Sequence, residues 1–174
     1  MTLRKPSLKP LFYIPVSFLI LLGLFKVLSC FFIFQFTDSL PKGIYLIEHG
    51  KVLTYGSLVI FPPPENVKGL LVERGWVPER LIENFFFMKP IVAIKGDKVE
   101  VSHQGCFING RYFGPVDKYD SKGRPLQNLD RVFVLGPDEY FVGVHQYHKS
   151  FDSRYFGTIR GSQIKGTVRP FLLF

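Results

Sequence analysis

Two very different parts of the chain are separated by the stretch Phe36-Thr37-Asp38-Ser39-Leu40-Pro41-Lys42-Gly43-Ile44-Tyr45. A long apolar run over residues 11–34 precedes this stretch, and many short strand-like segments follow it. Ser39, which carries a hydroxyl that can act as a nucleophile, lies five residues beyond the run. Five extended residues reach no farther than about 18 Å. We therefore expect Ser39 to act close to the surface from which the run emerges.

The apolar run predicts a transmembrane anchor over residues 11–34. About 24 residues are enough to cross a bilayer core of about 30 Å as a helix. Lys26 is the single charge in the run, and it costs about 2.5–3.5 kcal/mol on insertion scales. Roughly seventeen Leu, Ile, Phe and Val residues each return about 0.3–0.6 kcal/mol, so insertion remains favourable.

Charge around the run predicts its orientation. Arg4, Lys5 and Lys9 precede it without any acidic residue. By the positive-inside rule, residues 1–10 form a cytoplasmic tail, and residues 35–174 are exported as the outer domain of a single-pass protein. The lipid bilayer is therefore an expected partner.

Two alternatives for the run compete with a spanning helix. A cleavable signal has a shorter apolar core and a small-residue cleavage site, and neither is present. Val27-Leu28-Ser29-Cys30 loosely resembles a lipoprotein processing box, but Lys26 precedes it and the apolar residues 31–34 follow it. A mature N-terminus at Cys30, found by mass spectrometry, would exclude the spanning helix.

Composition excludes several other classes of protein. The chain of 174 residues has a net charge of +8, but its basic residues are scattered rather than gathered in a stripe, which argues against nucleic-acid binding. Cys30 and Cys106 are far apart in sequence and are not expected to form a disulfide. No cluster has the spacing of a metal site, so we expect neither a metal nor a cofactor.

The part after residue 35 predicts a mainly antiparallel β domain. Asn109-Gly110 is a strong two-residue hairpin signal because both positions accept positive φ. Residues 70–87 predict a short helix with an irregular stretch, and residues 119–128 predict a loop. Strands are expected at 44–47, 57–61, 91–94, 98–101, 106–108, 131–135, 140–144 and 166–169.

Three segments resemble the signature boxes of type I signal peptidases, which are membrane-anchored serine/lysine endopeptidases. They are Ser39-Leu40-Pro41, Lys89 seven residues before Gly96-Asp97, and Ser150-Phe151-Asp152-Ser153-Arg154. The longer matches at 39–45, 120–126 and 150–157 are most similar to the TraF-type, conjugative-transfer branch that processes pilins. The resemblance implies a signal-peptidase-like β domain behind an N-terminal transmembrane helix.

The resemblance also implies a role for each site residue. Ser39 is the nucleophile, and Lys89 is the general base and then the acid. Thr37 contributes its hydroxyl to an oxyanion hole. Ser150 orients Lys89, while Asp152 and Arg154 form a supporting ion pair. The spacing agrees with the pair, because residues two apart on a strand share a face.

The same resemblance implies a substrate and a location. The substrate is an exported precursor with small side chains before the cut site, either a pilin or another component of the conjugative machinery. The enzyme then lies on the periplasmic side of a bacterial inner membrane.

Elementary chemistry agrees with Lys89 as the base. A serine hydroxyl needs a nearby base, and a lysine must be neutral to serve as one. Burial among apolar groups lowers a lysine pKa from about 10.4 by up to 3–5 units. Apolar residues at 85–88 and 91–94 flank Lys89, whereas Lys42, Lys95 and Lys98 lie near turns or charges.

Alternatives remain open at this level. His145 and His148 could form a triad with Asp152, although their spacing does not select it. Pro90 stands where the family usually has a basic residue, and it predicts that Lys89 lies at a strand edge or start. A general signal peptidase and a non-catalytic, membrane-anchored assembly protein are the competing functions.

Overall fold

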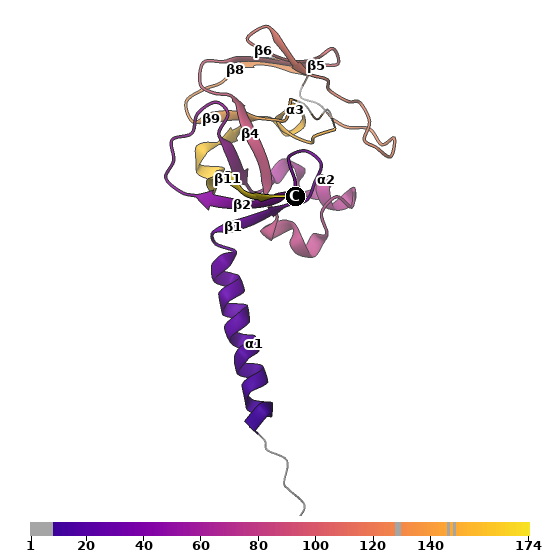
Figure 1. Ribbon diagram of the computed structural model, residues 1–174. Coiled ribbons are helices and arrows are strands. Elements are labelled where there is room, and N and C mark those ends of the chain that lie inside the picture. Colours follow the sequence, from indigo (N-terminus) through magenta and orange to yellow (C-terminus); the bar gives the residue numbers. More distant parts are fainter. Residues whose placement is uncertain (1–8, 128–129, 146, 148) are drawn as a thin grey trace, which may run out of the picture.

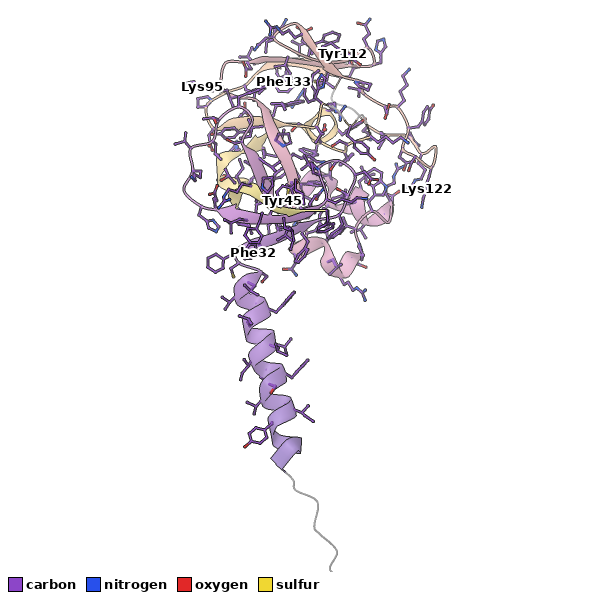
Figure 2. All side chains as sticks on the ribbon, in the orientation of Figure 1. Phe32, Tyr45, Lys95, Tyr112, Lys122 and Phe133 are labelled. Carbon is purple, nitrogen blue, oxygen red and sulfur yellow. The ribbon has the colours of Figure 1, made fainter. Side chains whose placement is uncertain are left out.

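A helical stalk and a β-rich body make up the computed structural model (Figure 1). The structure describes residues 9–127, 130–145, 147 and 149–174, with side chains from residue 13 onward. Helix α1 (Lys9–Leu28) extends away from the body, and strand β1 (Phe32–Gln35) enters the body directly after it. Figure 2 shows Phe32 at this junction.

The helix is shorter than the predicted run. It ends at Leu28, and β1 pairs in antiparallel fashion with β2 (Gly43–Glu48) instead of continuing the helix to residue 34. The pairing gives the backbone N–H and C=O groups of Phe32–Gln35 hydrogen-bond partners in the sheet. The hydropathy of these four residues alone does not predict such a partner strand. Over the described part of the chain, no helix has both the length and the apolar character needed to cross a membrane. The predicted transmembrane helix over residues 11–34 is therefore not supported.

The larger sheet has seven strands, and every pairing in it is antiparallel. Strand β4 is an interior strand of this sheet and lies between β3 and β9. The strands follow the order β1, β2, β11 (Gly166–Leu173), β3 (Leu58–Phe61), β4 (Phe87–Ala93), β9 (Glu139–Val142) and β10 (Ile159–Arg160).

A smaller antiparallel sheet lies at the end of the body away from the stalk (Figure 1). Its hairpin turns at Asn109 and Gly110, which both adopt positive φ, as the sequence predicted. The order is β7 (Arg111–Gly114), β6 (Gly105–Ile108), β5 (Lys98–Ser102) and β8 (Arg131–Val134). The two sheets confirm a mainly antiparallel β fold.

Helical segments are few and short in the body. They are α2 (Glu65–Glu73), the 3-10 helix η1 (Glu79–Asn84), α3 (Ser153–Phe156) and the 3-10 helix η2 (Gly161–Gln163). The first of them starts earlier than the predicted helix within residues 70–87, directly after Pro64, which is its N-cap and has φ −55° and ψ 143°.

Strand β4 is buried on both faces, which makes it a firm support for a functional side chain. Ile91 packs with Val59 and Val142 in one core cluster, while Val92 packs with Phe141 in another. Val92 and Ala93 pack in the same cluster, because the register of β4 against β9 shifts between Ile91 and Ala93. Five of the seven residues of β4 are buried, Lys89 among them, so its backbone is held by packing on both faces.

Candidate active site

Three segments distant in sequence meet at one lysine. Lys89 on β4 donates hydrogen bonds from Nζ to Ser39 Oγ at 3.2 Å and to Ser150 Oγ at 2.8 Å. Ser39 lies in the loop between β1 and β2, and Ser150 lies just before α3. Lys89 pairs in register with Val59 inside a sheet, so the expectation from Pro90 of a strand edge or start was wrong.

The loop that carries Ser39 is fixed by hydrogen bonds within it and at its ends. The buried Gln35 side chain donates to Thr37 Oγ1 at 2.7 Å and to the Thr37 carbonyl at 3.1 Å. Thr37 Oγ1 in turn lies 3.2 Å from Ser39 Oγ. Farther along, the Tyr45 hydroxyl donates to the Pro41 carbonyl at 2.8 Å. The loop therefore holds two hydroxyls side by side.

Gly43 ends this loop where no other residue fits. The carbonyl of Leu172 on β11 occupies the space that a Cβ atom at position 43 would need. The glycine of the motif thus lets β2 and β11 pair closely beside Ser39.

Burial tunes the charge of the lysine. Lys89 is only 5% exposed, and removal from water lowers its pKa from 10.5 to about 8. The charge of Asp152 opposes this change and that of Arg154 reinforces it. A substantial neutral fraction of the Lys89 amine therefore exists near physiological pH.

Asp152 and Arg154 form a fully buried ion pair beneath the site. The guanidinium donates to both carboxylate oxygens at 2.8 Å, and it also donates to the Ser150 carbonyl at 3.1 Å and the Pro115 carbonyl at 2.9 Å. The pair therefore ties the segment that carries Ser150 to the body. The two residues do not share a strand face as predicted, because Asp152 caps α3 and Arg154 lies within that helix.

The competing lysines lie elsewhere. Lys42 pairs with Asp38 at 2.9 Å on the surface, and Lys98 pairs with Glu100 at 2.7 Å. Lys95 is exposed to solvent, and Figure 2 shows it at the rim of the body. These amines are hydrated or paired, whereas Lys89 is withdrawn from water.

A histidine triad is not favoured by the described contacts. The His145 ring packs edge-on against Phe113, and the carboxylate of Asp152 accepts hydrogen bonds from Arg154 and from the Val144 N–H. His148 lies outside the described residues. No group of three or more potential metal ligands occurs among the residues that the structure describes.

A cleft of about 430 Å³ is lined by the three hydrogen-bonded side chains Ser39, Lys89 and Ser150. Sequence reasoning missed several of its walls, because they come from segments that only tertiary packing brings to Ser39. Their apolar members are Phe34, Phe36, Leu71, Trp76, Val77, Phe85, Phe86, Phe87, Met88 and Phe151. Such a cleft can hold an apolar polypeptide segment beside a nucleophile.

Comparison with known proteins shows the family to which these residues belong. The family model for signal peptidase, peptidase S26, matches residues 11–173. A plasmid transfer protein TraF of Escherichia coli is 35% identical over 141 residues, which are 77% of this chain and 78% of that protein. A conjugal transfer protein TraF of Agrobacterium fabrum is 30% identical over 146 residues, or 79% of this chain and 80% of that one.

One solved structure is similar at lower identity. A crystal structure of a signal peptidase I from Enterococcus faecalis V583 has a TM-score of 0.39 and 20% identity, covering 67% of this chain and 97% of that chain. The family and relatives inferred from the motifs around Ser39, Lys89 and Ser150 are confirmed. The chain therefore belongs to the signal peptidase family, peptidase S26.

Proposed function

We propose that this serine peptidase of the signal-peptidase type cleaves its precursor through a dyad of Ser39 and Lys89. Membership of the family makes the substrate an exported precursor. The observation that carries the dyad is the contact of Lys89 Nζ with Ser39 Oγ at 3.2 Å, made by an amine that is 5% exposed. Ser150 at 2.8 Å holds the same nitrogen in place.

The proposed steps use only these side chains. Neutral Lys89 accepts the Ser39 proton while Oγ attacks the scissile carbonyl, and the resulting ammonium then donates a proton to the leaving amine. Lys89 then takes a proton from a water molecule as this water attacks the acyl-enzyme, and it returns the proton to Ser39 Oγ as the ester bond breaks. Gln35 donates to Thr37 Oγ1, so the Thr37 hydroxyl proton is available to the oxyanion together with the Ser39 N–H.

The rate should depend on pH through Lys89. Because only the neutral amine accepts a proton, kcat/KM is expected to rise about tenfold per pH unit below the pKa of about 8 and to level off above about pH 9. A profile of initial cleavage rates from pH 6 to pH 10 measures this. A flat profile across pH 7–9 would contradict the role of Lys89.

The names of the relatives point to the class of precursor. Proteins of plasmid and conjugal transfer are similar over most of this chain, so we infer a component of a conjugative apparatus, with a pilin as the first candidate. The conjugative machinery is then a partner.

A lipid surface is the proposed location. Large apolar side chains along α1 are exposed, among them Ile14, Phe18, Ile20 and Phe25. Figure 2 shows side chains extending outward along the length of the stalk. Their transfer from water into lipid is favourable. The single-pass topology, with a cytoplasmic N-terminus and a periplasmic domain, stays a prediction.

Cleavage of defined precursors tests the proposal. The full-length wild type and the Ser39→Ala variant are incubated in membranes with candidate pilin precursors and with unrelated secretory precursors. The wild type should cut the pilin precursor, and Ser39→Ala should not. Ser102→Ala, a change on β5 in the smaller sheet, serves as the matched control and should cut normally. Mass spectrometry identifies the cut site.

Other outcomes select the competing functions. Cleavage of many unrelated precursors would indicate a general signal peptidase, and no cleavage by any protein would indicate an assembly role. Turnover by Ser39→Ala equal to that of the wild type would exclude Ser39 as the nucleophile.

A further inference from the structure

A second cavity, of about 600 Å³, lies beside the catalytic cleft. The two adjoin at a shared set of lining residues, so a polypeptide that extends past the end of the cleft comes next to the cavity. Residues that line both are Trp76, Tyr147, Lys149, Ser150 and Phe151. Ser39 and Lys89, the proposed nucleophile and base, line the cleft but not the cavity.

Aromatic rings dominate one side of this cavity. Trp76 meets the Phe151 ring edge-on at 5.2 Å between centroids, and Phe151 stacks on Tyr155 at 5.3 Å. The Tyr155 hydroxyl accepts a hydrogen bond from the Asp117 N–H at 3.0 Å, so its polar end is already bonded. Leu126 adds an aliphatic surface. These walls offer apolar contact to a large side chain.

The opposite rim is a loop, residues 117–126, that is clamped to the end of α2. Asp120 accepts hydrogen bonds from the Arg124 guanidinium at 2.8 Å and from the Arg74 guanidinium at 3.2 Å. Arg74, directly after α2, also donates to the Pro125 carbonyl at 2.8 Å. The rim is therefore set before anything binds, which lowers the entropy lost on binding.

The clamp also decides the charge that an occupant meets. Burial acts to raise the pKa of Asp120, but hydrogen bonds from Arg124 and Lys122 outweigh it and hold this pKa well below its usual range. The carboxylate stays ionised and is neutralised by two arginines. An occupant therefore needs no positive charge of its own to balance Asp120. The other charged residues of the lining, Asp117 and Lys149, are opposite in sign, so the aromatic side favours an apolar side chain.

We propose that this cavity is a substrate subsite that takes a large apolar side chain of the precursor, some residues away from the bond cut at Ser39. The proposal rests on the proposed function, because the occupant is the same polypeptide that enters the cleft. The shared wall of Trp76, Ser150 and Phe151 carries it. The small side chains expected next to the cut site do not fill such a space.

Binding without turnover tests the subsite. Trp76 is the only tryptophan of the chain and lines both the cleft and the cavity. Its fluorescence therefore reports the binding of a peptide to either space. Full-length Ser39→Ala protein is titrated with two soluble alanine-based peptides of equal length, one with a single phenylalanine. The phenylalanine peptide should bind about tenfold more tightly, in keeping with the burial of one aromatic side chain.

Two neighbouring substitutions give the matched comparison. Ser121 is exposed and lines the cavity, whereas Lys122 is exposed and does not line it; Figure 2 shows Lys122 at the tip of the loop, away from the body. In the Ser39→Ala background, Ser121→Phe should weaken phenylalanine-peptide binding about tenfold. Lys122→Phe should leave it within about twofold, since it fills no part of the cavity.

Each outcome bears on the subsite separately from proteolysis. Equal affinity for the two peptides, or equal affinities of Ser121→Phe and Lys122→Phe, would overturn the subsite even if the wild type cuts its precursor. Selective loss in Ser121→Phe would support it even if no precursor is cut, and only the proteolytic proposal would then fail.

Discussion

Replacement of Lys89 by methionine is expected to lower kcat/KM by about four orders of magnitude or more. Methionine has a similar length and suits the buried position on β4, but it cannot accept the Ser39 proton or return one to the leaving amine. Loss of a general base costs about 10²–10⁴ in rate, and loss of a member of a nucleophile–base pair costs up to about 10⁶. Single-turnover cleavage of a precursor measures the change.

The same substitution should make the protein more stable at neutral pH. The pKa of Lys89 falls from 10.5 to about 8 on folding, so the folded state disfavours the ammonium by about 3 kcal/mol. This penalty is complete below about pH 8, fades between pH 8 and 10.5, and is absent above. Methionine removes it but leaves Ser150 without its partner, which costs about 1–3 kcal/mol. The gain should therefore shrink as pH rises.

Lys95→Met is the matched control for both effects. Lys95 is exposed and follows the same strand, so its replacement should change neither cleavage nor the free energy of unfolding by a large amount. A folded Lys89→Met protein that cuts at the wild-type rate would remove Lys89 from the mechanism. A stability gain that persists unchanged at pH 11 would show that its cause is packing rather than charge.

The strands were predictable because their signals are local. Alternating apolar residues, prolines at strand ends and the dipeptide Asn109-Gly110 each act over a few positions, and β2, β3, β5 and β6 lie where those patterns predicted them. The lysine was also accessible to local reasoning. Its apolar neighbours on both sides indicated burial, and Lys89 is buried.

Features that depend on distant pairing escaped the sequence. The apolar residues of Phe32–Gln35 are compatible with a helix as well as with a strand. They form a strand because they pair with β2. Gln35 is a single polar residue in that run, so nothing local showed that it would brace Thr37. Trp76 likewise reaches the cleft through the chain path after α2. The alternation rule placed Asp152 and Arg154 on a strand, whereas the cap of α3 determines their conformation.

Replacement of Arg154 by methionine is expected to reduce the free energy of unfolding by about 3–5 kcal/mol. The substitution leaves the Asp152 carboxylate buried, with only backbone N–H groups as partners. It also removes the donors to the carbonyls of Ser150 and Pro115. Guanidinium denaturation of the full-length protein, followed by Trp76 fluorescence, measures the loss. Because the charge of Arg154 helps to lower the pKa of Lys89, its loss should also move the rising limb of the pH profile to higher pH where the variant is folded.

Comparison with a surface pair and with a double variant identifies the cause. Arg169 meets Glu48 at 3.3 Å with both side chains partly exposed, so Arg169→Met should cost at most about 1 kcal/mol. The double variant Asp152→Asn with Arg154→Met should be more stable than Arg154→Met alone, because it removes the unpaired buried charge. If the double variant loses the full sum of the two single losses, the charge is not the source of the effect. In that case the lost hydrogen bonds to Ser150 and Pro115 are what hold the segment that carries Ser150.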